Sequence, residues 1–124
     1  MTKTEHYEQL CEKVISISSD VRFAGVVNSK GEMISGRHGE NIEPLLSEDD
    51  VKMSIHYALQ KRDLYTNLAY KIGVEKSSIT EYEKVTMINI PINSNELFLI
   101  STEPRADYMK ILDFVRSNLD AEQT

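Results

Sequence analysis

The chain contains a single cysteine, Cys11, among its 124 residues. One cysteine excludes an internal disulfide and a zinc site built from cysteines, and this usage is typical of a reducing intracellular compartment. The sequence also lacks a run of about 18 apolar residues and a basic start followed by an apolar stretch, so neither membrane insertion nor a signal peptide is expected. We therefore predict a soluble, cytoplasmic protein.

Basic residues are also in short supply. Fourteen Lys and Arg stand against 20 Asp and Glu, which gives a formal net charge of −6 and a pI near 5.0. Because nucleic-acid binding needs a concentrated basic face, nucleic acid is disfavoured as a partner. The length of 124 residues and the hydrophobic content of 40% fit one globular domain, which we expect to span residues 1–124.

Signatures of catalysis and cofactor binding are missing as well. The three histidines fall in different predicted elements without metal-ligand spacing, and the stretch from Gly36 to Gly39 lacks a phosphate-binding pattern. Cys11 falls on an apolar helix stripe, where cysteine acts as a small hydrophobe. Arg37 and His38 could bind an anion from a loop flanked by glycines, although a solvated loop is the favoured interpretation. We expect no enzymatic activity, no cofactor and no metal.

The apolar periodicity predicts helices near both ends of the chain and in its middle. Apolar residues at three- and four-residue steps predict a helix from Thr4, its N-cap, to about Ser18, and another that begins at Pro104. Ser47, followed by three carboxylates, is typical of a helix start. Because neither Gly nor Pro follows before Gly73, we expect one middle helix of about 25 residues, twice the usual length.

The middle helix is apolar on two flanks. Met53, Tyr57 and Leu64 lie about a third of a turn away from its main apolar stripe. The residues of the main stripe are Val51, Ile55, Ala58, Leu59, Tyr65, Leu68, Ala69 and Ile72. A small domain can cover one flank with its own sheet, so another helix or a partner has to cover the second. We favour a partner.

Alternating residues predict strands between the helices. A strand at Val21–Asn28 is followed by a turn and a second strand at 32–35. Three more strands are expected at 78–83, 85–92 and 96–101, and the last is apolar on both faces and therefore central. Hairpin connections make the sheet mainly antiparallel. The expected fold class is α+β, a five-stranded sheet with flanking helices in the order helix-strand-strand-helix-strand-strand-strand-helix.

Two sequence runs resemble the last three strands of roadblock-type dynein light chain domains. They are TEYEKVTMINIP, from residue 80, and ELFLISTEP, from residue 96. The similarity includes the proline that ends one strand and the short link into the last helix. It implies the fold superfamily that roadblock domains share with longin and profilin domains. The runs RFAGVVNSKG, from residue 22, and EPLLS, from residue 43, are similar to a group of small, uncharacterised archaeal proteins, which implies no particular activity.

Roadblock domains form dimers through the long middle helix and an adjoining strand, and the dimer is a platform for motor complexes or small Ras-like GTPases. The resemblance therefore implies a non-catalytic, homodimeric interaction module or scaffold. Its dimer interface would use Met53, Tyr57 and Leu64 of the helix and Ile79 and Tyr82 of the strand. Its partners would be a second copy of the chain and a small GTPase or scaffold protein.

The alternative function is that of a small-ligand sensor with PAS-like or GAF-like architecture. Such domains enclose a ligand between an antiparallel sheet and its helices, so polar groups should converge on an apolar cavity. From the predicted strands, only Asn89 and Arg22 are candidates for those polar groups. Polar side chains around a closed cavity would favour the sensor, whereas an exposed second flank on the middle helix would favour the interaction module.

Overall fold

The structure, a computed structural model, describes residues 2–40 and 42–123. The elements are α1 (Lys3–Ile17), β1 (Val21–Asn28), β2 (Met33–His38), α2 (Glu48–Thr66), α3 (Ala69–Ile72), β3 (Ser78–Glu81), β4 (Thr86–Asn93), β5 (Glu96–Thr102) and α4 (Tyr108–Gln123). Apart from the short α3, their order is the predicted one. Among the described residues, none of the helices combines the length and the apolar character that a membrane crossing needs.

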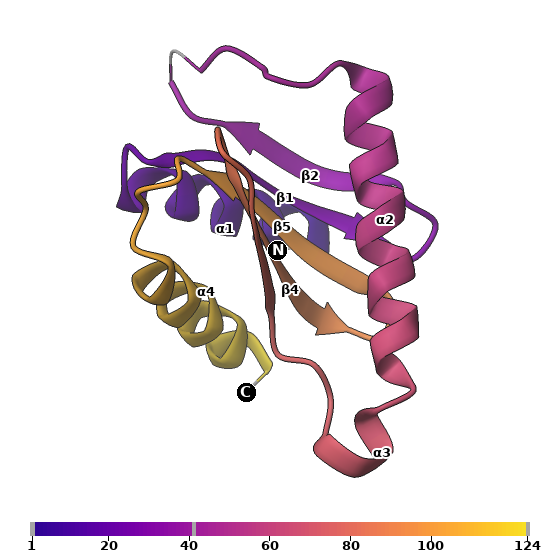
Figure 1. Cartoon of the computed structure of the whole chain (residues 1–124). Coiled ribbons are helices and arrows are strands. Elements are labelled where there is room, and N and C mark those ends of the chain that lie inside the picture. The colour runs from indigo at the N-terminus through magenta and orange to yellow at the C-terminus, as the bar shows by residue number, and fades with distance from the viewer. Residues whose placement is uncertain (1, 41, 124) are drawn as a thin grey trace.

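All strands belong to one five-stranded antiparallel sheet with the order β2-β1-β5-β4-β3 (Figure 1). Hairpins join β1 to β2, β3 to β4, and β4 to β5. The segment that contains α2 and α3 connects the β2 edge of the sheet to the β3 edge. Strand β5 lies in the centre, as its apolar run predicts, and the α+β fold class is confirmed.

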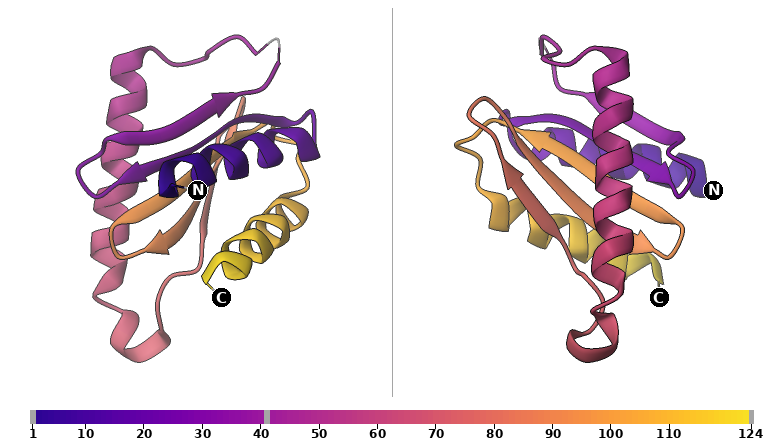
Figure 2. Two further views of the ribbon diagram at one scale, coloured as in Figure 1. Left: turned by 180° about the vertical axis from the view of Figure 1, so that it is seen from behind. Right: turned by 45° about the vertical axis from the view of Figure 1, so that its right-hand side comes forward.

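The main core lies between one face of the sheet and the helices α1 and α4, which both cover that face (Figure 2). Alternate strand residues point into this core, including Ile88 and Ile90 of β4 and Phe98 and Ile100 of β5, each at most 2% exposed. Val14 of α1 is fully buried against them. Every second residue of these strands therefore packs against the apolar stripes of the two helices.

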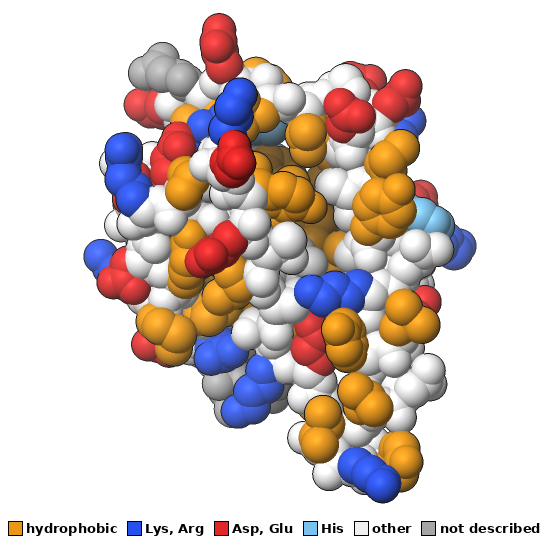
Figure 3. Space-filling model, viewed as in Figure 1, with side chains coloured by type: hydrophobic (Ala, Val, Ile, Leu, Met, Phe, Trp, Pro, Cys, Tyr) orange, Lys and Arg blue, Asp and Glu red, His pale blue; other side chains and the backbone are white. Residues whose placement is uncertain are grey.

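Helix α2 crosses the opposite face of the sheet (Figure 2). A smaller apolar cluster holds it there, formed by Ile55 of α2 with Val27 and Leu97 of the neighbouring strands. Both strand residues lie next to the ends of their strands, so α2 covers only part of this face. Beside α2 the surface is hollowed and shows apolar side chains (Figure 3).

The middle helix is interrupted, contrary to the prediction of one helix as far as Gly73. Helix α2 ends at Thr66, and α3 follows after Asn67 and Leu68. The backbone N–H groups of Asn67 and Leu68 donate to carbonyls three residues back, at 3.3 and 3.0 Å, which is the tightened pattern of a helix end. Gly73, with a φ of 87°, closes α3 and so has the C-terminal role predicted for it.

Candidate functional site

Helix α2 is fixed to the sheet along one side only. Ile55 is buried in the small cluster, and Ala58 and Leu59 pack against it from the same side. Near the end of the helix, the Arg62 guanidinium donates hydrogen bonds to the backbone carbonyls of Asn93 and Glu96, the latter at 3.1 Å. Apolar packing in the middle of α2 and these bonds near its end therefore set the position of the helix.

The other side of α2 carries an exposed apolar stripe. Met53, Tyr57 and Leu64 are 53, 60 and 69% exposed, and their spacing of four and seven residues places them on one face of the helix (Figure 3). This face points away from Ile55, on the side opposite the sheet. The sequence predicted this second flank, and the structure leaves it uncovered by the described residues of the chain. We name Met53, Tyr57 and Leu64 the α2 stripe.

The predicted main stripe of the middle helix is less buried than expected. Of its eight members only Ile55 is buried, and Ala58, Leu59 and Ala69 are half-buried. The other members are exposed, namely Val51, Tyr65, Leu68 and Ile72. The reason is geometric, because the apolar contacts of α2 with the sheet are confined to its middle and α3 lies beyond the sheet (Figure 1). The apolar surface of this segment is therefore larger than the sequence predicted.

The two interface residues predicted in the adjoining strand lie at the edge of the sheet. Ile79 belongs to β3, the outermost strand, and its side chain is exposed. Tyr82 is exposed as well, but it lies in the turn after β3, where its backbone N–H donates to the carbonyl of Val85 at 2.9 Å. The α2 stripe and this edge are two separate parts of the surface within one chain.

The prediction that Arg37 and His38 lie in a loop is wrong, because both residues belong to β2. Neighbouring strand residues point to opposite faces of a sheet. Arg37 accordingly pairs with Glu12 of α1 at 3.6 Å, whereas the His38 ring lies 4.9 Å from the Phe23 ring, centroid to centroid. The two side chains therefore point to opposite faces of the sheet, and a ligand role for them stays a prediction.

The groups with potential for chemistry are dispersed. The histidines lie in α1, β2 and α2, and within residues 2–40 and 42–123 no three His, Cys, Asp or Glu side chains are placed to hold a metal ion. Burial raises the pKa of the Cys11 thiol to about 11. Cys11 therefore stays protonated at neutral pH, where a thiolate would be needed for nucleophilic attack.

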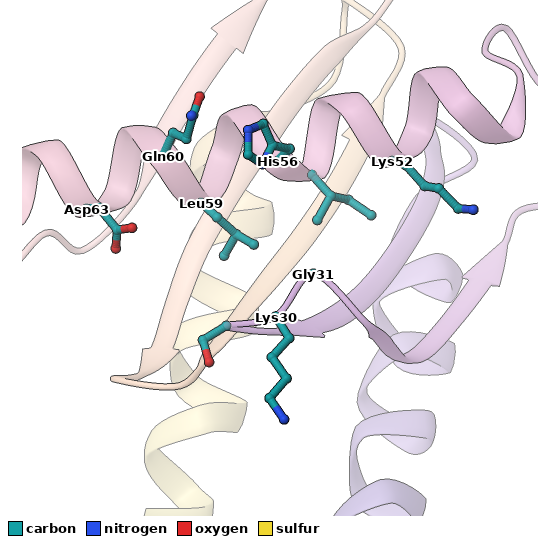
Figure 4. Close-up of a pocket in the computed structure, with 9 residues that line it drawn as sticks. Lys30, Gly31, Lys52, His56, Leu59, Gln60 and Asp63 are labelled. Atoms are coloured by element: carbon teal, nitrogen blue, oxygen red, sulfur yellow. The ribbon is translucent and has the colours of Figure 1, made fainter.

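An open groove of about 450 Å³ lies between α2 and the turn from β1 to β2 (Figure 4). Ile55 and Leu59 contribute apolar side chains to its lining, which also includes Lys30, Lys52 and Asp63. Figure 4 shows the two lysine side chains pointing in different directions. The groove therefore differs from the closed cavity with converging polar groups that a ligand sensor requires.

A buried carboxylate ties the start of α1 to the turn between β4 and β5. Glu96 accepts hydrogen bonds from the Tyr7 hydroxyl at 2.7 Å and from the Asn93 amide at 2.8 Å, and it pairs with the Lys3 ammonium at 2.7 Å. Burial alone would raise the pKa of Glu96, but the bonds from Lys3, Asn93 and Tyr7 together outweigh burial and hold that pKa below its usual value. No local sequence pattern indicates this network, because Lys3 and Tyr7 are far along the chain from Asn93 and Glu96.

We predict that Glu96→Gln lowers the free energy of unfolding at pH 7 by about 1–3 kcal/mol, since it removes charge-assisted hydrogen bonds from a buried site. Because the folded-state pKa of Glu96 is lowered, its contribution is complete above the usual carboxyl pKa and is lost as pH falls through the folded-state pKa. Urea unfolding at pH 7 and pH 3 should therefore show the wild-type advantage shrinking in acid. Glu83→Gln, at an exposed carboxylate, is the control, and an advantage of Glu96 that is equal at both pH values would contradict the prediction.

Comparisons with known proteins agree with this fold. The sequence model of a family described as "Family of unknown function (DUF6659)" matches residues 2–122. Among curated proteins no match to the chain is found. The fold is similar to the gliding protein MglB from Thermus thermophilus, with a TM-score of 0.77 and 12% identity over 98% of this chain and 89% of that one.

Two further solved structures are similar to this chain. A Roadblock/LC7 domain from Streptomyces avermitilis has a TM-score of 0.73 and 11% identity over 94% of this chain and 93% of that one. A profilin from Schizosaccharomyces pombe has a TM-score of 0.61 and 9% identity over 93% of this chain and 94% of that one. Identities this low show a common fold, and the predicted roadblock-type fold with its profilin-like relatives is confirmed.

Proposed function

The chain belongs to the DUF6659 family, a family of unknown function, and we propose that it is a non-catalytic protein-interaction module that works as a homodimer. The observation that carries this proposal is the α2 stripe. Three large apolar side chains at helical spacing are more than half exposed, on the side of α2 that faces away from the sheet. A contiguous apolar surface of this kind is typical of a surface that another protein covers.

A second copy of the chain fits this surface because the α2 stripe can be self-complementary. Two-fold symmetric dimers use the same surface on both subunits. In an antiparallel pair of α2 helices whose symmetry axis passes between Tyr57 and Gln60, Met53 of each copy lies opposite Leu64 of the other. Tyr57 then packs near the axis, so both apolar ends of the stripe are covered at once.

The edge strand β3 supports the same dimer. An edge strand presents unpaired backbone N–H and C=O groups, which a second copy can pair. Strand β3 is short, and Ile79 and Tyr82 add apolar side chains at this edge. We therefore keep Ile79 and Tyr82 in the proposed interface with the α2 stripe.

The resemblance to roadblock domains supports a proposal for the partner class. Roadblock dimers are platforms for motor complexes or small Ras-like GTPases, and we propose a small Ras-like GTPase or a scaffold protein as the partner of this dimer. The proposal includes a single domain that acts in the cytoplasm. The proposed function assigns no catalytic reaction to the chain, which agrees with the dispersed histidines and the protonated thiol of Cys11.

The ligand-sensor alternative finds less support. Arg22, one of its two candidate polar groups, donates hydrogen bonds to the Glu103 carboxylate and to the backbone carbonyl of Glu43, both at 2.8 Å. Arg22 therefore fastens the connection after β2 to the body of the domain. Asn89 is half-buried on the face of the sheet opposite the main core. Its strand, β4, is separated by β5 from β1, the strand of Arg22. The two groups do not converge on one cavity.

The first test is the mass of the protein in solution. Light scattering behind a sizing column, over a range of concentrations, should give a mass near twice 14.2 kDa, because the α2 stripe is buried only when two copies associate. The dimer fraction should fall on dilution according to a single dissociation constant. A monomer at every concentration up to the solubility limit would contradict the homodimer.

A further inference from the structure

The segment after α2 presents a second apolar surface to solvent. Leu68, Tyr70, Ile72 and Val74 are 48, 81, 79 and 82% exposed. Figure 1 shows α3 projecting beyond the sheet, and Figure 3 shows apolar side chains around a basic one at this extremity of the molecule. We name these four residues the apolar knob.

The fold of the single chain does not account for the apolar knob. A helix as short as α3, with four residues, is not stable through its own hydrogen bonds, and helices in proteins owe most of their stability to packing. Yet three of its side chains, those of Tyr70, Ile72 and Val74, are the most exposed large hydrophobic residues among those that the structure describes. A contiguous exposed apolar surface of this kind indicates a contact with another molecule.

The opposite end of α2 offers a surface of matching character. Leu45 and Leu46, 53 and 38% exposed, lie immediately before the helix, and Glu48 and Asp49 follow in its first turn. The knob carries a basic residue, Lys71, between its apolar side chains. One end of the α2–α3 segment is thus apolar and basic, and the other is apolar and acidic, so the two ends are complementary in charge.

The antiparallel pairing of α2 brings these two ends together. When Met53 of one copy lies opposite Leu64 of the other, the end of each α2 is level with the beginning of its neighbour. The segment that follows Thr66 in one copy then lies near the residues that precede Glu48 in the other. We propose that the apolar knob of each copy docks on Leu45 and Leu46 of a second copy, with Lys71 beside the acidic first turn of α2. This contact rests on the proposed homodimer and occurs twice in it, by symmetry.

Site-specific cross-linking tests the contact separately from the dimer. Leu46→Cys and Ile72→Cys are made in separate chains and co-expressed, and the purified protein is treated with a short bismaleimide. Cys11 stays in place, because it is buried. The co-expressed pair should give a covalent dimer. Each variant alone should give little, since like residues lie at opposite ends of an antiparallel pair.

The outcomes distinguish failure of this contact from failure of the proposed function. A dimer by light scattering without cross-linking between the two variants, or with equal cross-linking of each variant to itself, would overturn the contact and leave the homodimer standing. A monomer by light scattering would overturn both. As a second measurement, Ile72→Glu should weaken the dimer at least about tenfold. Met109→Glu, at an exposed methionine of α4, should leave it unchanged, and equal effects of the two would contradict the contact.

Discussion

Replacing Tyr57 and Leu64 together by glutamate is expected to turn the dimer into a folded monomer. Both side chains are exposed in the single chain, so their replacement leaves the core and the small cluster under α2 intact. In the antiparallel pair each substitution acts twice, and four carboxylates would enter the interface. The far-ultraviolet circular dichroism spectrum should stay that of the wild type, while the mass from light scattering halves.

The expected size of the effect follows from the apolar surface involved. Burying one large apolar side chain contributes about 1.5–3 kcal/mol, so losing four of them, two from each copy, weakens association by several kcal/mol. Since about 1.4 kcal/mol is a factor of ten in the dissociation constant, the double variant should bind itself at least roughly a thousandfold more weakly. The charge repulsion between the new carboxylates acts in the same direction.

Lys52→Glu is the matched control for this variant. It lies on the same helix, is exposed, and changes the net charge by the same two units as the double substitution. Its side chain stands at the groove beside the turn from β1 to β2, away from the α2 stripe. Lys52→Glu should therefore dimerise like the wild type. Persistence of the dimer in the Tyr57→Glu, Leu64→Glu variant would place the interface elsewhere on the chain.

The parts of the fold that sequence analysis predicted are those governed by local signals. Strand β1 has the bounds predicted for it, because its β-branched run ends at a turn rich in polar residues. Helix α2 begins after Ser47 as predicted, and Ser47 and Asp50 form a reciprocal capping box, with the Ser47 hydroxyl accepting from the Asp50 N–H at 3.1 Å. In both places the determining residues are neighbours in sequence.

The starts of α1 and α4, where more than one residue could cap the helix, were predicted less well. Helix α1 begins earlier than expected. The hydroxyl of Thr2, rather than that of Thr4, accepts the capping hydrogen bond, which comes from the backbone N–H of Glu5. Helix α4 begins at Tyr108 rather than at Pro104, and the Asp107 carboxylate accepts from the backbone N–H of Lys110 at 3.1 Å. In both cases the sequence offers more than one residue that is suited to a helix start. Residue propensity alone does not decide which of them begins the helix.

The errors at the candidate site come from tertiary contacts. Strand β2 continues through Gly36 to His38 because it pairs with β1, with Gly36 opposite Gly25, and this pairing overrides the tendency of glycine to end a strand. An alanine methyl at Gly25 would stand 2.7 Å from the Phe23 ring, so the glycines let that ring lie close over both strands. The residues of the predicted loop form a strand because they pair with β1. Short-range sequence patterns do not reveal this pairing.

The interruption of the middle helix was equally invisible to short-range patterns. No glycine or proline marks it. The Thr66 hydroxyl donates to the carbonyl of Arg62 at 2.8 Å, a bond that competes with the helix ladder, and the sheet does not continue under the last turn to support it. The residues that the sequence assigned to a buried stripe beyond this point became the apolar knob. The apolar knob and the α2 stripe are therefore the two apolar surfaces that we expect a partner to cover.

Phe98→Ala is expected to cause the largest loss of stability of any single truncation discussed for this chain. Phe98 lies in the central strand β5, is fully buried, and belongs to the main core between the sheet and helices α1 and α4. Truncation of such a side chain leaves a cavity and costs about 3–5 kcal/mol, a large part of the 5–15 kcal/mol that stabilises a typical domain. The melting temperature should fall by roughly 10–20 °C.

Leu99→Ala is the control for this prediction, because Leu99 is the next residue of β5 and points to the opposite face of the sheet. There it is only half-buried and packs against the small cluster under α2. Its truncation should cost less than about 2 kcal/mol, since a partly exposed side chain loses less on truncation. Thermal and guanidinium unfolding at one fixed protein concentration measure both variants, which matters because association raises apparent stability. Equal losses at Phe98 and Leu99 would contradict a core that lies mainly on the side of α1 and α4.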